Sequence, residues 1–125
     1  MKIYIGHSTD YDFEKELYEP IRSSLLNTEH EIILPHEAYE DASDFVTRDI
    51  IKTCDLMIAE VSYPSTGLGI ELGWADLSKC PIICIYHSGQ RTSSSLKIVT
   101  DKFIEYTDKD DLMKKLKDTI VKLRS

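Results

Sequence analysis

The sequence predicts a three-layer α/β sandwich built around a five-stranded parallel sheet. Short apolar runs alternate along the chain with segments of helical periodicity, which is the pattern of parallel strands connected by helices. The run 55–61, DLMIAEV, is almost wholly apolar at its centre, as strands covered on both faces are. The 125 residues, of which 42% are hydrophobic and 30% charged, fit one domain spanning 1–125.

The helices and strands can be placed in chain order. Phe13, Leu17, Ile21 and Leu25 recur every fourth residue and indicate the first helix. Pro20 lies within it and has no amide hydrogen, so we expect a kink or a late start there. The expected strands are 2–6, 31–34, 55–61, 81–86 and 102–106, and the expected helices are 13–25, 43–53, 70–78 and 108–124.

This order of elements predicts where chemistry takes place. Right-handed crossovers make the flavodoxin-like strand order 2-1-3-4-5 the simplest arrangement. Ligands of such sheets bind beyond the carboxyl ends of the strands, near the switch point between the first and third strands. We therefore expect segments 6–8, 62–69 and 86–95 to meet at one site.

Composition and charge restrict the classes of binding partner and the cellular compartment that we expect. The chain has 15 Lys and Arg against 22 Asp and Glu, a net charge of −7 without a basic stripe, which argues against nucleic acid as a partner. No apolar run approaches the roughly 18 residues of a membrane span, and the N-terminus does not read as a signal peptide. Cys54, Cys80 and Cys84 are odd in number and lie in apolar surroundings, which predicts buried reduced thiols and a cytoplasmic protein.

The segment 59–75, AEVSYPSTGLGIELGWA, carries the strongest chemical signal. Gly67 and Gly69 let a backbone approach a ligand closely, and the segment leads into a helix N-terminus. We expect Glu71 in the first turn of that helix, where the helix dipole favours the ionised carboxylate. Such a carboxylate is a competent nucleophile toward a sugar carbon, although many first-turn acids only complement the dipole.

The run 64–73, PSTGLGIELG, resembles the signature of the nucleoside 2-deoxyribosyltransferase family, and most closely its 2′-deoxynucleoside 5′-monophosphate N-glycosidase branch. The resemblance extends from the first strand, IYIG at 3–6, to the loop after the fourth strand. It implies that Glu71 attacks the anomeric carbon, expels the base and forms a glycosyl-enzyme intermediate that water or a second base resolves. Tyr4 matches the family tyrosine that orients this nucleophile.

The resemblance also implies residues that bind the sugar and the base. Gly6, His7 and Ser8 occupy the loop that lines the sugar and base pocket in the family, although His7 replaces a small residue. His36 matches a histidine near the base. Its alternative reading is an ordinary histidine of a surface loop.

Two serines correspond to phosphate-binding positions. Family transferases that act on free nucleosides place an aspartate where this chain has Ser65, and a hydroxyl can donate to a 5′-phosphate that a carboxylate would repel. Ser65 therefore favours a nucleotide substrate. The segment 88–93 resembles one that crosses to a neighbouring subunit, where a serine at the position of Ser93 meets the phosphate. We therefore expect a homodimer or a higher homo-oligomer.

The family's general acid is harder to assign. The family protonates the leaving base with an aspartate in the helix before the third strand. Alignment without gaps from Asp55 puts Thr47 at that position, with Asp44 and Asp49 nearby. Asp49 looks most like the family acid if the helix is shortened by two residues, and it is our choice, while Asp44 stays open.

The function that we expect is cleavage of the N-glycosidic bond of 2′-deoxynucleoside 5′-monophosphates. The first alternative is a transferase that exchanges bases on free deoxynucleosides. The run 6–8 with Asp10 also resembles the first box of TIR-like NAD hydrolases, and a non-catalytic nucleotide-binding module on the same fold is a further alternative. His7, His36 and His87 fall at strand ends without the spacing of a metal site, so we expect no metal and no cofactor.

Overall fold

The computed structural model describes residues 1–38 and 44–124, without the side chains of 38 and 44–46. Five parallel strands form one sheet in the order β2-β1-β3-β4-β5, which confirms the predicted topology. The strands are β1 (Lys2–His7), β2 (Glu31–Ile33), β3 (Leu56–Glu60), β4 (Ile82–His87) and β5 (Phe103–Tyr106).

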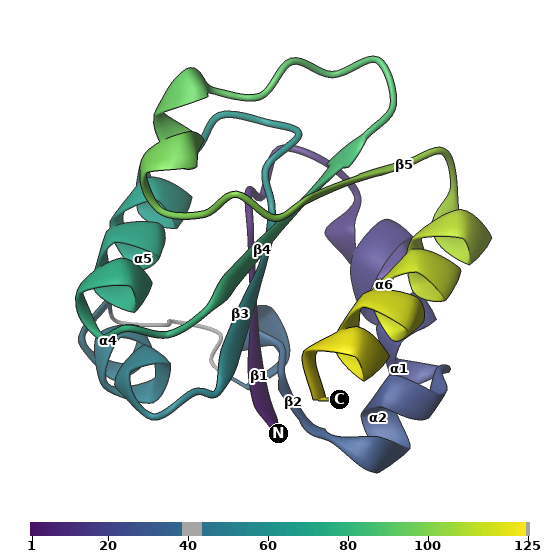
Figure 1. The fold of residues 1–125 in the computed structure, drawn as a ribbon, viewed down its shortest axis with the longest axis horizontal. Helices are drawn as coiled ribbons and strands as arrows, with labels where there is room; N and C mark the ends of the chain where they lie inside the picture. Colours follow the sequence, from purple (N-terminus) through teal and green to yellow (C-terminus); the bar gives the residue numbers. More distant parts are fainter. Residues whose placement is uncertain (39–43, 125) are drawn as a thin grey trace.

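Helices cover both faces of the sheet (Figure 1). One layer contains α4 (Asp44–Lys52) and α5 (Thr66–Leu77), and the other contains η1 (Glu14–Tyr18), α1 (Glu19–Arg22), α2 (Leu25–Glu29) and α6 (Lys109–Arg124). The short segments α3 (Pro35–Ala38) and η2 (Ser94–Ile98) follow β2 and precede β5. Each layer packs its own apolar cluster against the sheet, centred on Leu17, Ile21 and Leu116 in one and on Met57 and Leu72 in the other.

The first expected helix, 13–25, is interrupted. It consists of the π-helical turn η1, the short helix α1 and, after a break, α2. The amide of Glu19 donates to the carbonyl of Glu14, and Pro20, the second residue of α1, has no amide hydrogen of its own. The helix does not start late at Pro20; it changes there from π-helical to α-helical hydrogen bonding, and Leu17 and Ile21 are both buried.

The start of α5 corrects the sequence analysis. The helix begins at Thr66, four residues earlier than expected, because Ser65 caps it by accepting the amide hydrogen of Leu68 at 3.3 Å. Gly67 and Gly69 are therefore helical, and Glu71 lies in the second turn. The expectations of a glycine-rich ligand loop and of a first-turn dipole effect on Glu71 were wrong. A Cβ added at either glycine would meet no atom within 4 Å, so both positions leave open space beside the helix.

The three cysteines are free and buried. Burial raises the pKa of the Cys54 and Cys84 thiols to about 12 and that of Cys80 to about 11, so all three are protonated near neutral pH. Position 43, the expected cap of α4, lies outside the described residues. No helix in the described part of the chain has the length and apolar character that crossing a membrane requires.

Candidate active site

A pocket of about 280 Å³ opens where β1, α3, α4 and α5 meet. It lies at the switch point between β1 and β3, as expected. Of the three segments expected to meet there, residues of 6–8 and 62–69 line this pocket, whereas residues of 86–95 line a neighbouring one. Its polar side chains come from five parts of the chain. Tyr4, His7 and Thr9 lie on β1 and just after it, His36 lies on α3, Thr47 on α4, Ser65 at the N-cap of α5 and Glu71 within α5. The indole of Trp74 supplies an apolar wall.

Tyr4 and Glu71 form the central contact of this pocket. Tyr4 is only 1% exposed, and its phenol donates a hydrogen bond to Glu71 Oε2. Burial, and then the charge of Glu71, raise the pKa of Tyr4 far above its ordinary value, so the proton stays on the phenol and the carboxylate accepts. Because Tyr4 lies on a central strand, this bond fixes the direction of the Glu71 carboxylate. The expected proximity of the two residues is confirmed.

Gly6 on β1 lies close to the same carboxylate, at a position that leaves no room for a side chain. A Cβ at this position would lie 2.7 Å from Met57 Cε, 2.9 Å from Leu68 Cδ1 and 3.6 Å from Glu71 Oε1. Only glycine therefore lets β1 pass this closely beneath α5 without displacing the two apolar side chains. Gly6, expected to bind substrate, lines neither this pocket nor its neighbour, and lies beneath the side chains of Leu68 and Glu71.

His7 is a neutral, hydrogen-bonded residue of the pocket wall. Its Nδ1 lies 2.8 Å from the carbonyl oxygen of Ser8, which can only accept, so Nδ1 carries the hydrogen. Nε2 therefore accepts from the Tyr18 hydroxyl at 2.6 Å. Burial is the main cause that lowers the pKa of His7 to about 4, which keeps the imidazole neutral near pH 7. The ring of His36 lies next to it, with centroids 5.2 Å apart.

The remaining substrate-binding candidates divide between two neighbouring pockets. Ser65 and Gly67 line the pocket of Glu71, whereas Gly69 and Ser93 line an adjacent pocket of about 490 Å³ together with Arg91. Ser65 contributes to both, so the two spaces meet at the start of α5. Ser8 is 2% exposed and accepts the amide hydrogen of Asp10 at 3.1 Å, which makes it part of the loop's internal structure.

The structure does not bring Asp49 to this site. The Asp49 side chain is 63% exposed and lies 3.9 Å from Arg48 Nε, whereas Thr47 is buried and lines the pocket. Two residues along an α-helix point to nearly opposite sides, so the phase of α4 that turns Thr47 inward turns Asp49 outward. The side chain of Asp44 lies outside the described residues. Glu71 is the one carboxylate that lines the pocket within the described part of the chain.

His87 lies apart from the other histidines. Its Nδ1 contacts the carbonyl of Ser88, and its ring lies 5.5 Å from that of Tyr106. His7 and His36 adjoin each other, but within 1–38 and 44–124 no three His, Cys, Asp or Glu residues are grouped so as to hold a metal ion.

Two pocket residues, Ile70 and Trp74, were not expected from the sequence, although they share a helix face with Gly67 and Glu71. Gly67, Ile70, Glu71 and Trp74 recur at spacings of three and four, and all line the pocket. This spacing would have identified Trp74 and Ile70 once the helix was placed to begin at Thr66. Tyr18 was not considered, and nothing in its local sequence indicates the bond to His7.

The chain is similar to proteins that cleave or exchange N-glycosidic bonds. No protein-family model matches the chain. Two curated relatives, from Syntrophotalea carbinolica and Methanosarcina barkeri, are both named “Putative 2′-deoxynucleoside 5′-phosphate N-hydrolase 1” and are 36% identical over 73 residues and 33% identical over 72. The matches cover 56% and 55% of this chain, and 51% and 45% of the relatives. The chain therefore spans about half the length of the curated relatives it matches.

Solved structures share the fold across nearly the whole chain. A CMP N-glycosidase from Clostridium botulinum has a TM-score of 0.68 at 23% identity, covering 94% of this chain and 99% of that one. A 2-deoxyribosyltransferase from Bacillus psychrosaccharolyticus has a TM-score of 0.62 at 21% identity, covering 90% of each chain. The comparisons confirm the flavodoxin-like fold and the resemblance to the nucleoside 2-deoxyribosyltransferase family, in particular to its deoxynucleotide N-hydrolase branch.

Proposed function

We propose that this chain, as a relative of the nucleoside 2-deoxyribosyltransferase family, cleaves the N-glycosidic bond of 2′-deoxynucleoside 5′-monophosphates. The products are the free base and deoxyribose 5-phosphate. The observation that carries the proposal is the Tyr4–Glu71 hydrogen bond on the wall of a pocket at the sheet's switch point. The name of the curated relatives supports the same reaction and substrate.

The geometry suits covalent catalysis by Glu71. Its carboxylate attacks the anomeric carbon, the bond from that carbon to the base breaks, and the electron pair leaves with the base. Water then attacks the same carbon from the side that the base has left, and Glu71 is released as a carboxylate. Tyr4 keeps one carboxylate oxygen hydrogen-bonded, so the nucleophile does not have to reorient before attack.

The cleavage is tested by incubating the protein with each of the four deoxynucleoside monophosphates and separating free base by chromatography. Free deoxynucleosides with a second base form a parallel assay for the transferase alternative, and NAD forms one for the TIR-like alternative. Base release from a monophosphate supports the proposal. Exchange on free nucleosides alone, nicotinamide release alone, or ligand binding without any turnover would each contradict it.

Ser65 is the residue that we propose to select a 5′-phosphate. It lies where the two pockets meet, and Arg91 and Ser93 line the adjacent pocket. A 5′-phosphate at this junction would meet the Ser65 hydroxyl, the N-terminus of α5 and the Arg91 guanidinium. In our earlier expectation Ser93 reaches the phosphate of a neighbouring subunit. We propose that the active protein is a homo-oligomer, which sedimentation tests.

The change Ser65→Asp is expected to reverse the preference for a phosphate. Asp caps helices as well as Ser does, so α5 should remain intact, while the new charge repels a 5′-phosphate. We expect kcat/KM for the monophosphate to fall by about 10²-fold, the equivalent of losing a charge-assisted bond and adding repulsion, with a smaller effect on the free deoxynucleoside. Ser23→Asp, exposed at the end of α1, is the control for added charge. Equal losses on both substrates would show that Ser65 does not read the phosphate.

Tyr4→Phe is expected to lower kcat more than it raises KM. The substitution removes the donor to Glu71 Oε2 and leaves the ring in the core, so the carboxylate loses its fixed orientation. We expect a decrease in kcat of about 10- to 100-fold, in the range seen when a positioning hydrogen bond is lost. Tyr86→Phe, on β4 and away from the pocket, is the matched control. An unchanged kcat in Tyr4→Phe would exclude the positioning role.

A further inference from the structure

We propose that His36 protonates the leaving base, an inference that rests on the proposed cleavage reaction. Expulsion of a base leaves an electron pair on a ring nitrogen, and a proton delivered there lowers the barrier. Asp49, which the sequence analysis chose for this task, is exposed to solvent outside the pocket. The proton has to come from another group that faces the substrate.

Each of the other titratable groups described in the pocket already uses its proton in a hydrogen bond or is needed in its ionised form. The proton of Tyr4 is held in the bond to Glu71, and Glu71 is needed as a carboxylate. His7 uses its single hydrogen on the carbonyl of Ser8, and a pKa of about 4 leaves it neutral. His36 remains, and histidine is the side chain best suited to donate a proton near neutral pH.

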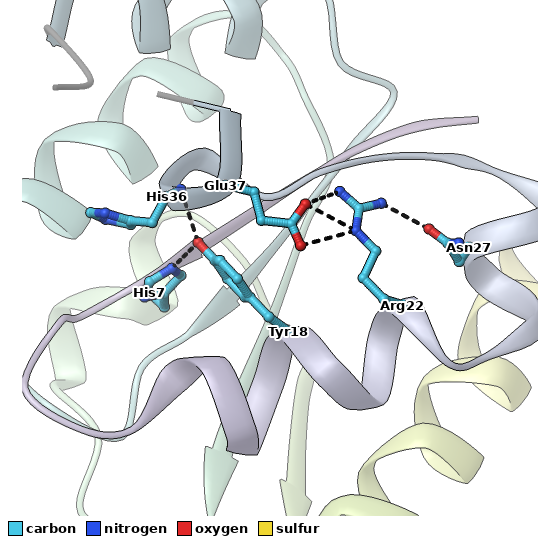
Figure 2. Close-up of polar contacts among 6 residues, drawn as sticks. All are labelled: His7, Tyr18, Arg22, Asn27, His36 and Glu37. Atoms are coloured by element: carbon cyan, nitrogen blue, oxygen red, sulfur yellow. Dashed lines mark hydrogen bonds and ion pairs between the residues drawn. The ribbon is translucent and has the colours of Figure 1, made fainter. Parts of the chain in front are cut away.

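The backbone around His36 is held in place by two connected sets of hydrogen bonds (Figure 2). The amide of His36 donates to the Tyr18 hydroxyl at 3.1 Å, and that hydroxyl in turn donates to His7. Arg22 donates to both carboxylate oxygens of Glu37, with N–O distances of 2.8 to 3.3 Å, so the residue after His36 is fixed to α1. Bidentate pairing of this kind sets orientation as well as distance.

The imidazole of His36 points away from the Arg22–Glu37 ion pair. Figure 2 shows the His36 ring extending to the side opposite the Arg22–Glu37 pair. The ring lies 5.2 Å from those of His7 and Phe13, between centroids, and it lines the Glu71 pocket. A rigid backbone with an accessible ring at its end is the arrangement that a proton donor to a bound base requires.

The charged and titratable groups around His36 come from each element packed near it. They are Tyr4 and His7 on β1, Glu14 and Tyr18 on η1, Glu19 and Arg22 on α1, Glu71 across the pocket on α5 and Glu37 on α3 itself. Positive charge on His36 is one of the causes that lower the pKa of His7, in agreement with their adjacent rings. His7 therefore stays neutral beside His36, and His36 is the pocket histidine whose ring is free of the Ser8 and Tyr18 hydrogen bonds that hold His7.

The proton balance closes over one turnover. The His36 imidazolium gives its proton to the base as the bond to the anomeric carbon breaks and the Glu71 ester forms. The neutral imidazole then accepts a proton from the water that enters where the base has left, and the resulting hydroxide equivalent displaces Glu71. A single group serves first as acid and then as base in this way in retaining glycoside hydrolysis.

The test uses a leaving group that needs no proton. 7-Methyl-2′-deoxyguanosine 5′-phosphate already carries a positive charge on its base, whereas dGMP requires protonation. In His36→Asn we expect kcat/KM for dGMP to fall by about 10²- to 10⁴-fold, the usual contribution of general acid catalysis. For the methylated substrate we expect less than about a tenfold loss, because only binding contacts are removed. If pyrimidines are preferred, dUMP and its 5-nitro derivative replace this pair.

Matched variants distinguish His36 from the other candidates for the general acid. His87→Asn, an exposed histidine outside the pocket, controls for loss of an imidazole, and thermal unfolding of His36→Asn controls for folding. Equal losses on both substrates, or no loss, would overturn the role of His36. Asp44→Asn or Asp49→Asn showing the leaving-group dependence instead would assign the acid to that residue. If the wild-type protein releases no base from either substrate, the proposed function fails rather than this inference.

Discussion

Glu71→Gln is expected to abolish turnover and leave the fold intact. An amide oxygen is too weak a nucleophile to form the glycosyl ester, yet it still accepts the hydrogen bond from Tyr4, so α5 keeps its position. We expect kcat to fall by about 10⁴-fold or more, as when the nucleophile of a covalent mechanism is removed. Chromatography of released base measures the loss.

Intact mass spectrometry makes the same prediction chemically specific. A fluorine at the 2′ position slows both attack and hydrolysis, because the transition states resemble an oxocarbenium ion, and with a good leaving group the ester accumulates. The wild-type protein should gain the mass of the fluorinated sugar phosphate, and Glu71→Gln should not. Glu105→Gln, exposed on β5, is the matched control. Retained turnover in Glu71→Gln, or an adduct at another residue, would contradict nucleophilic catalysis by Glu71.

The sheet could be predicted from the sequence because strand periodicity and right-handed crossovers are local or general properties. The alternation of strands and helices, together with the buried run at β3, was enough to fix the order of all five strands. The same reasoning put the site at the carboxyl ends of β1 and β3. Tyr4 and Glu71 come together because one lies on the inner strand β1 and the other on α5, which packs against that strand.

The errors arose where one interaction decides between two local structures. Gly67 and Gly69 are poor helix formers, so the pattern favoured a loop, but the cap by Ser65 starts the helix before them. Whether Thr47 or Asp49 faces the pocket depends on the rotation of α4 about its own axis, which packing against the sheet determines. The bond between His7 and Tyr18 joins residues 11 positions apart in the sequence, and no local pattern indicates it. Such contacts require the three-dimensional structure.

Glu60 occupies the most enclosed polar position described in the fold, and its replacement should destabilise the protein strongly. The side chain is 1% exposed at the end of β3. It accepts the amide hydrogen of Ser62 at 2.7 Å, the Ser62 hydroxyl at 2.9 Å and the hydroxyl of Tyr106. The Ser62 hydroxyl also accepts the amide hydrogen of His87 at 2.7 Å. Glu60 therefore joins the carboxyl ends of β3, β4 and β5.

Glu60→Leu leaves these donors buried without an acceptor. Each unsatisfied buried donor costs about 1 to 3 kcal/mol, so we expect the free energy of unfolding to fall by about 3 kcal/mol or more. Glu60→Gln keeps an acceptor oxygen and the shape of the side chain, and we expect a loss of about 1 kcal/mol. Denaturant titration followed by circular dichroism measures both values. A Leu variant as stable as the Gln variant would show that the three bonds contribute little.

The same pair of proteins should differ in pH dependence. Burial is the main cause that raises the pKa of Glu60, while the Tyr106 and Ser62 hydrogen bonds oppose the rise. The folded protein therefore binds this proton more tightly than the unfolded chain. The resulting stability is fully present below the ordinary glutamate pKa of about 4.3 and is lost as the pH rises through the raised value. Glu60→Gln cannot lose a proton there. The stability of the wild-type protein relative to Glu60→Gln should thus decrease as the pH rises from about 4 toward neutrality. A difference that stays constant, or that increases with pH, would mean that Glu60 is already ionised throughout and that its three donors outweigh its burial.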